Sequence, residues 1–143
     1  MTIRIVRDQA APMRHEVIIG RNRLAVDGSV EEGGEGSGPS PHDLYDTALG
    51  ACKALTVLWY AKKKGFPVEG IEVSVDRDAS GERSGTYRLS AELTLTGNLT
   101  PAQREELLRV ASKCPVHKLM TEVTTEITTT LAPWPGQASA TTP

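Results

Sequence analysis

The sequence lacks the features that define several classes of protein. It has only two cysteines in 143 residues, too few for a framework of structural disulfides. With 16 Lys and Arg against 18 Asp and Glu, its net charge of −2 gives no general attraction to nucleic acid or to an anionic membrane surface. No segment approaches the roughly 20 consecutive apolar residues of a transmembrane helix. We therefore expect neither nucleic acid nor membrane as a partner.

The N-terminal segment also lacks the features of a secretory signal. It reads Met-Thr-Ile-Arg-Ile-Val, which alternates as a strand does and has neither an apolar core nor a cleavage site. We predict a cytoplasmic protein. In a reducing compartment a disulfide is more often transient and catalytic than structural, so Cys52 and Cys114 become candidates for redox chemistry.

The pattern of apolar residues predicts a single α+β domain with antiparallel sheets. Alternation, or a run of β-branched residues, predicts strands at residues 2–6, 17–19, 24–26, 71–75, 87–95 and 124–131. The Gly-rich loop at residues 31–41 lacks the Lys-Ser/Thr pair of a phosphate-binding loop, and we interpret it as a connector. The domain is expected to span residues 1–132, and the Pro-, Ala-, Ser- and Thr-rich segment 133–143 is predicted to be a disordered tail.

Two capping sequences predict helices. Ser-Pro-His-Asp at residues 40–43 starts a long helix that runs to about Lys64 and ends at Gly65. Thr-Pro-Ala-Gln at residues 100–103 starts a second helix, which must kink or break at Cys114-Pro115, and residues 116–121 can form another helical turn. The long helix carries Cys52 within its broad apolar face.

The residues alone leave the role of the cysteines open. A cysteine on an apolar helix face, as at position 52, is often buried and inert. Cys114 lies at a helix break with His117 three residues on, where free backbone donors could lower the pKa of its thiol. Cys52 and His42 would complete four zinc ligands on paper, but Cys-Pro-Val-His supplies only two of the four that a structural zinc needs. We predict neither a metal nor a bound cofactor.

Two motifs resemble those of the OsmC/Ohr family, the osmotically inducible protein C and organic hydroperoxide resistance proteins. The first is Gly-Pro-Ser-Pro-His-Asp-Leu at residues 38–44, continuing to Ala-Leu-Gly-Ala-Cys at 48–52. The second is Ala-Ser-Lys-Cys-Pro-Val-His at residues 111–117. The resemblance covers about residues 10–132. It implies an OsmC-like fold with a long central helix that carries the first cysteine, assembled as an intertwined homodimer.

The resemblance implies a thiol-dependent peroxidase that reduces organic hydroperoxides in oxidative-stress defence. Cys52 would be the peroxidatic cysteine and Cys114 the resolving one. In such a cycle a thiolate attacks the O–O bond, the resulting sulfenic acid condenses with the second thiol, and an external dithiol reductant restores both thiols. A disulfide requires Cα atoms within about 4.4–6.8 Å, so the two positions must converge in the fold.

The resemblance also implies an arginine from the N-terminal sheet beside the peroxidatic cysteine, positioned by a glutamate near the start of the long helix. Arg21 is the expected match, with Arg23 as its alternative, and it could reach Cys52 of the partner subunit. The chain departs from the family at the glutamate, where it has His42 followed by Asp43. Asp43 could orient the arginine or cap the helix.

We expect His42, Leu55 and His117 to contact the substrate. The main alternative is a non-catalytic OsmC-like module that binds a small hydrophobic ligand beside Cys52 or senses redox state, and the missing glutamate favours it. The third hypothesis is a purely structural dimer with buried, inert cysteines.

Overall fold

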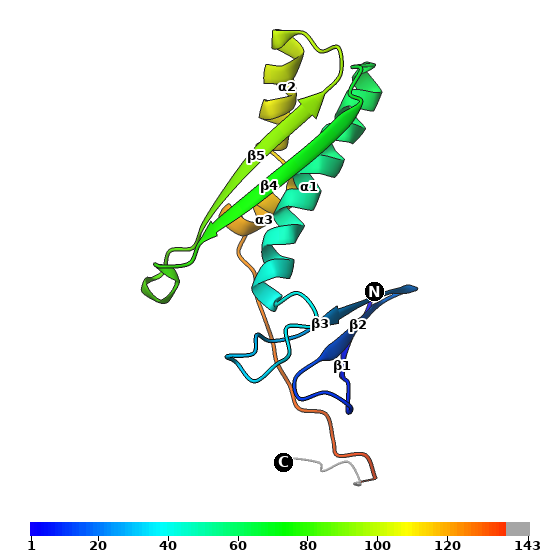
Figure 1. Ribbon diagram of the computed structural model, residues 1–143, viewed down its shortest axis with the longest axis vertical. Coiled ribbons are helices and arrows are strands. Elements are labelled where there is room, and N and C mark those ends of the chain that lie inside the picture. Colours follow the sequence, from blue (N-terminus) through cyan, green and yellow to red (C-terminus); the bar gives the residue numbers. More distant parts are fainter. Residues whose placement is uncertain (137–143) are drawn as a thin grey trace.

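The computed structural model describes residues 1–136, which form two antiparallel sheets and three α-helices (Figure 1). The N-terminal sheet contains β1 (Ile3–Arg7), β2 (His15–Ile19) and β3 (Asn22–Val26) in that order. Gly20, with a φ of +59°, forms the turn between β2 and β3 together with Arg21. This backbone conformation favours glycine because it has no Cβ.

Helix α1 (Pro41–Lys64) begins and ends where its sequence predicts. The Ser40 hydroxyl accepts the Asp43 N–H at 3.1 Å, and the Asp43 carboxylate accepts the Ser40 N–H at 2.9 Å. Gly65 ends the helix in the left-handed conformation, with a φ of 72°. The capping box and the glycine stop are local signals, so the bounds of α1 follow from the sequence.

The second sheet is the long hairpin of β4 (Gly70–Asp78) and β5 (Arg88–Thr96), joined through a 3-10 turn, η1 (Glu82–Ser84). It lies against α1 and α2 (Pro101–Ala111) in Figure 1, and the core between them is small and apolar. Gly50 lets α1 approach β4 closely, because a Cβ there would come within 2.8 Å of a Val75 methyl group. The core residues, all at most 3% exposed, are Val57, Ala61, Leu107 and Ala111.

The predicted break at Cys114-Pro115 is confirmed. Helix α2 ends at Ala111, and α3 (Pro115–Thr121) starts in a new direction with Cys114 as its N-cap residue. Since α3 also contacts α1, the chain folds back so that the break faces the middle of the long helix (Figure 1).

The prediction of a strand at residues 124–131 is wrong for the single chain. These residues form no strand and are exposed, with Ile127 at 82% and Leu131 at 98%. A strand needs a neighbouring edge for its hydrogen bonds, and neither sheet of the described residues pairs with this segment. Residues 137–143 of the predicted tail lie outside the described residues.

None of the helices formed by residues 1–136 combines the length and the apolar character needed to cross a bilayer.

Candidate active site

The fold brings Cys52 and Cys114 together from positions 62 residues apart. Cys52 lies in the middle of α1, and Cys114 lies at the break between α2 and α3. The backbone N–H of Val116, in the first turn of α3, donates to Sγ of Cys52 at 3.5 Å. The Cys114 thiol is close enough to Cys52 for a side-chain hydrogen bond, and both cysteines are free thiols.

The two thiols have different surroundings. Cys52 is half-buried, with its Sγ 3.9 Å from the Thr56 hydroxyl, whereas Cys114 is fully buried. Burial raises the pKa of the Cys114 thiol, and the neighbouring Cys52 raises it further. The hydrogen bond from the backbone N–H of His117 and the charge of Lys53 act in the opposite direction and lower the pKa. Cys52 is therefore the more accessible of the two cysteines.

Lys53 is a buried cation beside this pair that sequence reasoning missed. It is 7% exposed, and its Nζ donates to the Ala111 carbonyl at 2.8 Å and to Nδ1 of His117 at 3.1 Å. An ammonium group has no acceptor, so Nδ1 accepts and a neutral His117 ring carries its hydrogen on Nε2. A lysine within the otherwise apolar face of α1 was the signal for this contact.

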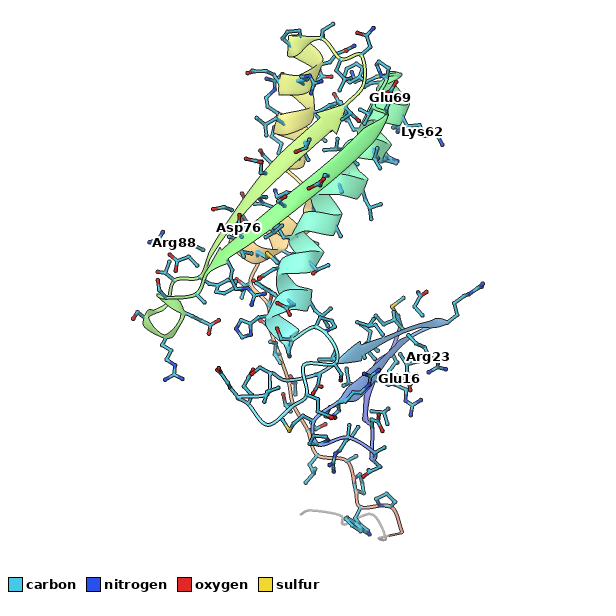
Figure 2. The ribbon with its side chains drawn as sticks, in the orientation of Figure 1. Glu16, Arg23, Lys62, Glu69, Asp76 and Arg88 are labelled. Atoms are coloured by element: carbon cyan, nitrogen blue, oxygen red, sulfur yellow. The ribbon has the colours of Figure 1, made fainter. Side chains whose placement is uncertain are left out.

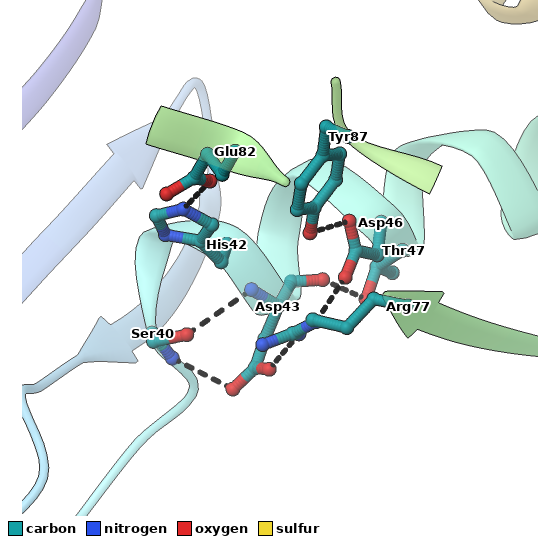
Figure 3. Close-up of polar contacts among 8 residues, drawn as sticks. All are labelled: Ser40, His42, Asp43, Asp46, Thr47, Arg77, Glu82 and Tyr87. Carbon is teal, nitrogen blue, oxygen red and sulfur yellow. Dashed lines mark hydrogen bonds and ion pairs between the residues drawn. The ribbon is translucent and has the colours of Figure 1, made fainter. Parts of the chain in front are cut away.

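A polar network joins the first turns of α1 to the hairpin (Figure 3). Nε of Arg77 on β4 donates to Asp46 at 2.5 Å, and its Nη2 pairs with Asp43. The hydroxyl of Tyr87 donates to the other oxygen of Asp46 at 2.7 Å. Burial, followed by the hydrogen bond to Asp46, raises the pKa of Tyr87 to about 12. The pKa of Asp43 is lowered, first by the Ser40 backbone N–H and then by Arg77.

Asp43 therefore caps α1, one of the two roles that the sequence left open, and it also binds an arginine other than the expected Arg21 or Arg23. The arginine comes from β4 and not from the N-terminal sheet. Sequence reasoning missed both Arg77 and Asp46, since they lie 31 residues apart and only the packing of β4 on α1 pairs them.

The arginines expected from the N-terminal sheet lie apart from the cysteines of their own chain. Arg21 is exposed in the β2–β3 turn, and Arg23 forms an exposed ion pair with Glu16 at 3.3 Å (Figure 2). Within residues 1–136, no hydrogen bond or ion pair links either arginine to α1. Neither side chain supplies a positive charge to Cys52 within this one chain.

Of the residues expected to contact substrate, His117 alone adjoins the thiols. His42 pairs with Glu82 of the 3-10 turn at 2.6 Å (Figure 3). Leu55, one turn after Cys52 on α1, is 68% exposed. Across residues 1–136, no three His, Cys, Asp or Glu side chains are grouped as metal ligands, and the four-ligand zinc set does not assemble.

A half-buried and a buried thiol, brought together by a long helix and a helix break against an antiparallel hairpin, define a class of small two-cysteine α+β proteins. The model of the OsmC-like protein family matches residues 34–130, which include both cysteines. The chain belongs to this family, and the resemblance seen in its motifs is confirmed. A comparison with curated proteins found no match.

Solved structures share the fold at low sequence identity. A protein from Psychrobacter arcticus, described as an osmotic stress induced and detoxification response protein, is 22% identical with a TM-score of 0.68, over 82% of this chain and 86% of that one. An organic hydroperoxide resistance protein OsmC from Legionella pneumophila is 20% identical with a TM-score of 0.61, over 85% and 90%. The organic hydroperoxide resistance protein OhrB of Bacillus subtilis is 19% identical with a TM-score of 0.55, over 85% and 92%. These similarities confirm the predicted α+β, OsmC-like fold.

Proposed function

We propose that the protein is a thiol-dependent peroxidase that reduces organic hydroperoxides, with Cys52 as the peroxidatic and Cys114 as the resolving cysteine. The observation that carries the proposal is the position of the Cys52 sulfur, half-buried and hydrogen-bonded to the N–H of Val116 beside the buried Cys114 thiol. A purely structural pair of cysteines would need no such difference in exposure. The names of the Legionella and Bacillus proteins agree with this activity.

The reaction needs only the two thiols and an external dithiol. The Cys52 thiolate attacks the hydroperoxide, the O–O bond breaks, and the products are an alcohol and a sulfenic acid on Cys52. The Cys114 thiol then displaces the sulfenic oxygen as water and forms the Cys52–Cys114 disulfide. A cytoplasmic dithiol then reduces the Cys52–Cys114 disulfide by thiol–disulfide exchange. The dithiol becomes a disulfide, and both cysteines return to free thiols.

The test is a thiol titration with mass spectrometry after treatment with cumene hydroperoxide. Wild-type protein should lose both free thiols, consume one equivalent of peroxide per chain without reductant and gain one intramolecular disulfide. Cys52→Ser should consume no peroxide, and Cys114→Ser should retain a sulfenic acid or higher oxide on Cys52. Wild-type thiols that survive excess peroxide would refute the proposal.

We also propose that two copies form an intertwined homodimer in which Arg21 of one subunit lies beside Cys52 of the other. Large apolar side chains are exposed on several elements of the single chain, as expected when a partner covers them. They include Ile3, Ile5, Leu55, Trp59, Leu108, Leu119, Ile127 and Leu131. Light scattering should give twice the mass of one chain, and Arg21→Ala should lower the reactivity of Cys52 while Arg23→Ala does not.

The alternative, a binding module, is favoured by one observation. An open cleft of about 620 Å³ lies between α1, β5 and α3, and its lining is part apolar and part polar, with Arg88, Ser90, His117 and Thr121 as the polar residues. Its apolar residues are Tyr45, Leu49, Tyr87, Leu89 and Met120. Neither cysteine lines the cleft, so a hydrophobic ligand bound there with inert thiols would support this alternative.

A further inference from the structure

The break between α2 and α3 is attached to α1 by one buried side chain. Nζ of Lys53 reaches the Ala111 carbonyl, three residues before Cys114, and Nδ1 of His117, three residues after it. Two of the three ammonium hydrogens are thereby used on either side of the cysteine. Because Lys53 is only 7% exposed, its charge acts on nearby groups with little screening by solvent.

The surroundings of the Cys114 thiol contain few other charges. From α1 the Cys52 side chain lies within hydrogen-bond distance and the charge of Lys53 acts on the thiol, and from α3 the backbone N–H of His117 donates to it. A small cavity of about 200 Å³ lies beside Lys53 and His117, and the strands contribute only apolar residues to it: Val73, Leu89, Ala91 and Leu93. On α2, Glu106 has a buried carboxylate oxygen, but it precedes Cys114 by eight residues, about two helical turns.

We infer that Lys53 is a positioning residue for the resolving step, which orients the α2–α3 break and supplies the positive charge that balances the Cys114 thiolate. This inference rests on the proposed function, because it concerns the second thiol of that cycle.

The thiolate of Cys114 occurs twice in the cycle. In the first case it attacks Sγ of Cys52, the S–S bond forms, the S–O bond breaks, and the departing hydroxide takes up a proton to become water. In the second case the reductant attacks Sγ of Cys52, the S–S bond breaks, and Cys114 leaves as a thiolate that is then protonated. Both times a negative charge appears on a fully buried sulfur, which costs free energy unless a cation is near.

A reagent other than peroxide separates this step from the peroxidase reaction. Dithiobis(nitrobenzoate) forms a mixed disulfide with Cys52 and releases one thionitrobenzoate. Cys114 then attacks that mixed disulfide and releases the second. The rate of the second release, followed by absorbance from pH 6 to 10, measures the Cys114 thiolate alone.

Lys53→Met and Lys53→Gln should slow the second release about three- to tenfold at neutral pH and move the midpoint of its pH profile upward, because the thiolate loses its cation. Lys53→Gln removes the charge but retains an N–H donor for the Ala111 carbonyl. It therefore distinguishes the effect of the charge from the effect of the hydrogen bond. Lys53→Arg should keep the wild-type profile. The matched control is Lys113→Met, which removes an exposed lysine adjacent to Cys114.

The inference is wrong if the midpoint of the pH profile in Lys53→Met and Lys53→Gln is the same as in the wild type, whatever the rate. It is also wrong if Lys113→Met shifts the midpoint equally. If both neutral variants fail to fold by circular dichroism, the cation serves folding and the inference also fails. If wild-type protein shows the second release but does not consume peroxide, the proposed function fails while the assignment of Lys53 stands.

Discussion

The guanidinium of Arg77 on β4 holds the carboxylate of Asp46 on α1, with Nε and Oδ2 2.5 Å apart (Figure 3). Asp46 is only 6% exposed, and its second oxygen accepts the Tyr87 hydroxyl. The first turns of α1 are thus bound to β4 and to the residue that precedes β5. These contacts help to set the orientation of α1 on the hairpin, and so the position of Cys52 relative to the break between α2 and α3.

Replacing Asp46 by Ala should lower the free energy of unfolding by about 2 kcal/mol, because the partly buried Tyr87 hydroxyl and the guanidinium lose their acceptor. Urea denaturation followed by circular dichroism measures the change. The control is Glu105→Ala, which breaks an exposed pair with Arg109 at 3.7 Å and should cost less than about 0.5 kcal/mol. Equal losses in the two variants would show that the Asp46 contacts do not stabilise the fold.

Local signals in the sequence predict the bounds of the helices, whereas contacts between distant residues could not be predicted from it. The bounds of α1 follow from the capping box at Ser40 and the stop at Gly65, both formed by near neighbours. The contact of Arg77 with Asp46 depends on how β4 packs on α1, which no local pattern encodes. Residues 124–131 have the composition of a strand, but composition cannot supply the edge that a strand must pair with.

The carboxylate of Asp27 should make the stability of the protein depend on pH in the acid range. Hydrogen bonds, foremost from the Ser37 hydroxyl, lower its pKa to about 2. Because the folded-state pKa is lower than the unfolded value near 3.8, this stabilisation is fully present above pH 4 and is lost as the pH falls toward 2. Wild-type Tm should therefore fall more steeply than that of Asp27→Asn between pH 4 and 2.

Thermal melts at several pH values test this prediction, with Asp8→Asn as the control for an exposed aspartate that accepts a bond from Ala10. If the Asp27→Asn and wild-type curves stay parallel through this range, the hydrogen bonds of Asp27 contribute nothing to the pH dependence.

The two thiols should differ in their reactivity toward iodoacetamide. Only the thiolate reacts, and the pKa of the Cys114 thiol is raised chiefly by its burial, so less thiolate forms at any pH below that value. Using Cys114→Ser and Cys52→Ser to isolate each thiol, we expect Cys52 to be alkylated at least about tenfold faster at pH 8. Mass spectrometry after timed quenching gives the rates. In urea the two rates should converge, and a native Cys114 that reacts as fast as Cys52 would contradict its burial.

Trp59 should be a major contact of the proposed homodimer. It is 61% exposed and lies one turn after Leu55, on the side of α1 turned away from the core residue Val57. Large aromatic residues at the centre of an interface often contribute more than 2 kcal/mol to binding, so Trp59→Glu should weaken the dimer by at least about tenfold. Sedimentation over a range of concentrations measures the dissociation constant. Thr94→Glu, which adds the same charge to the exposed face of β5, should leave the dimer intact. A Trp59→Glu protein that sediments as wild type would place the interface away from this face of α1.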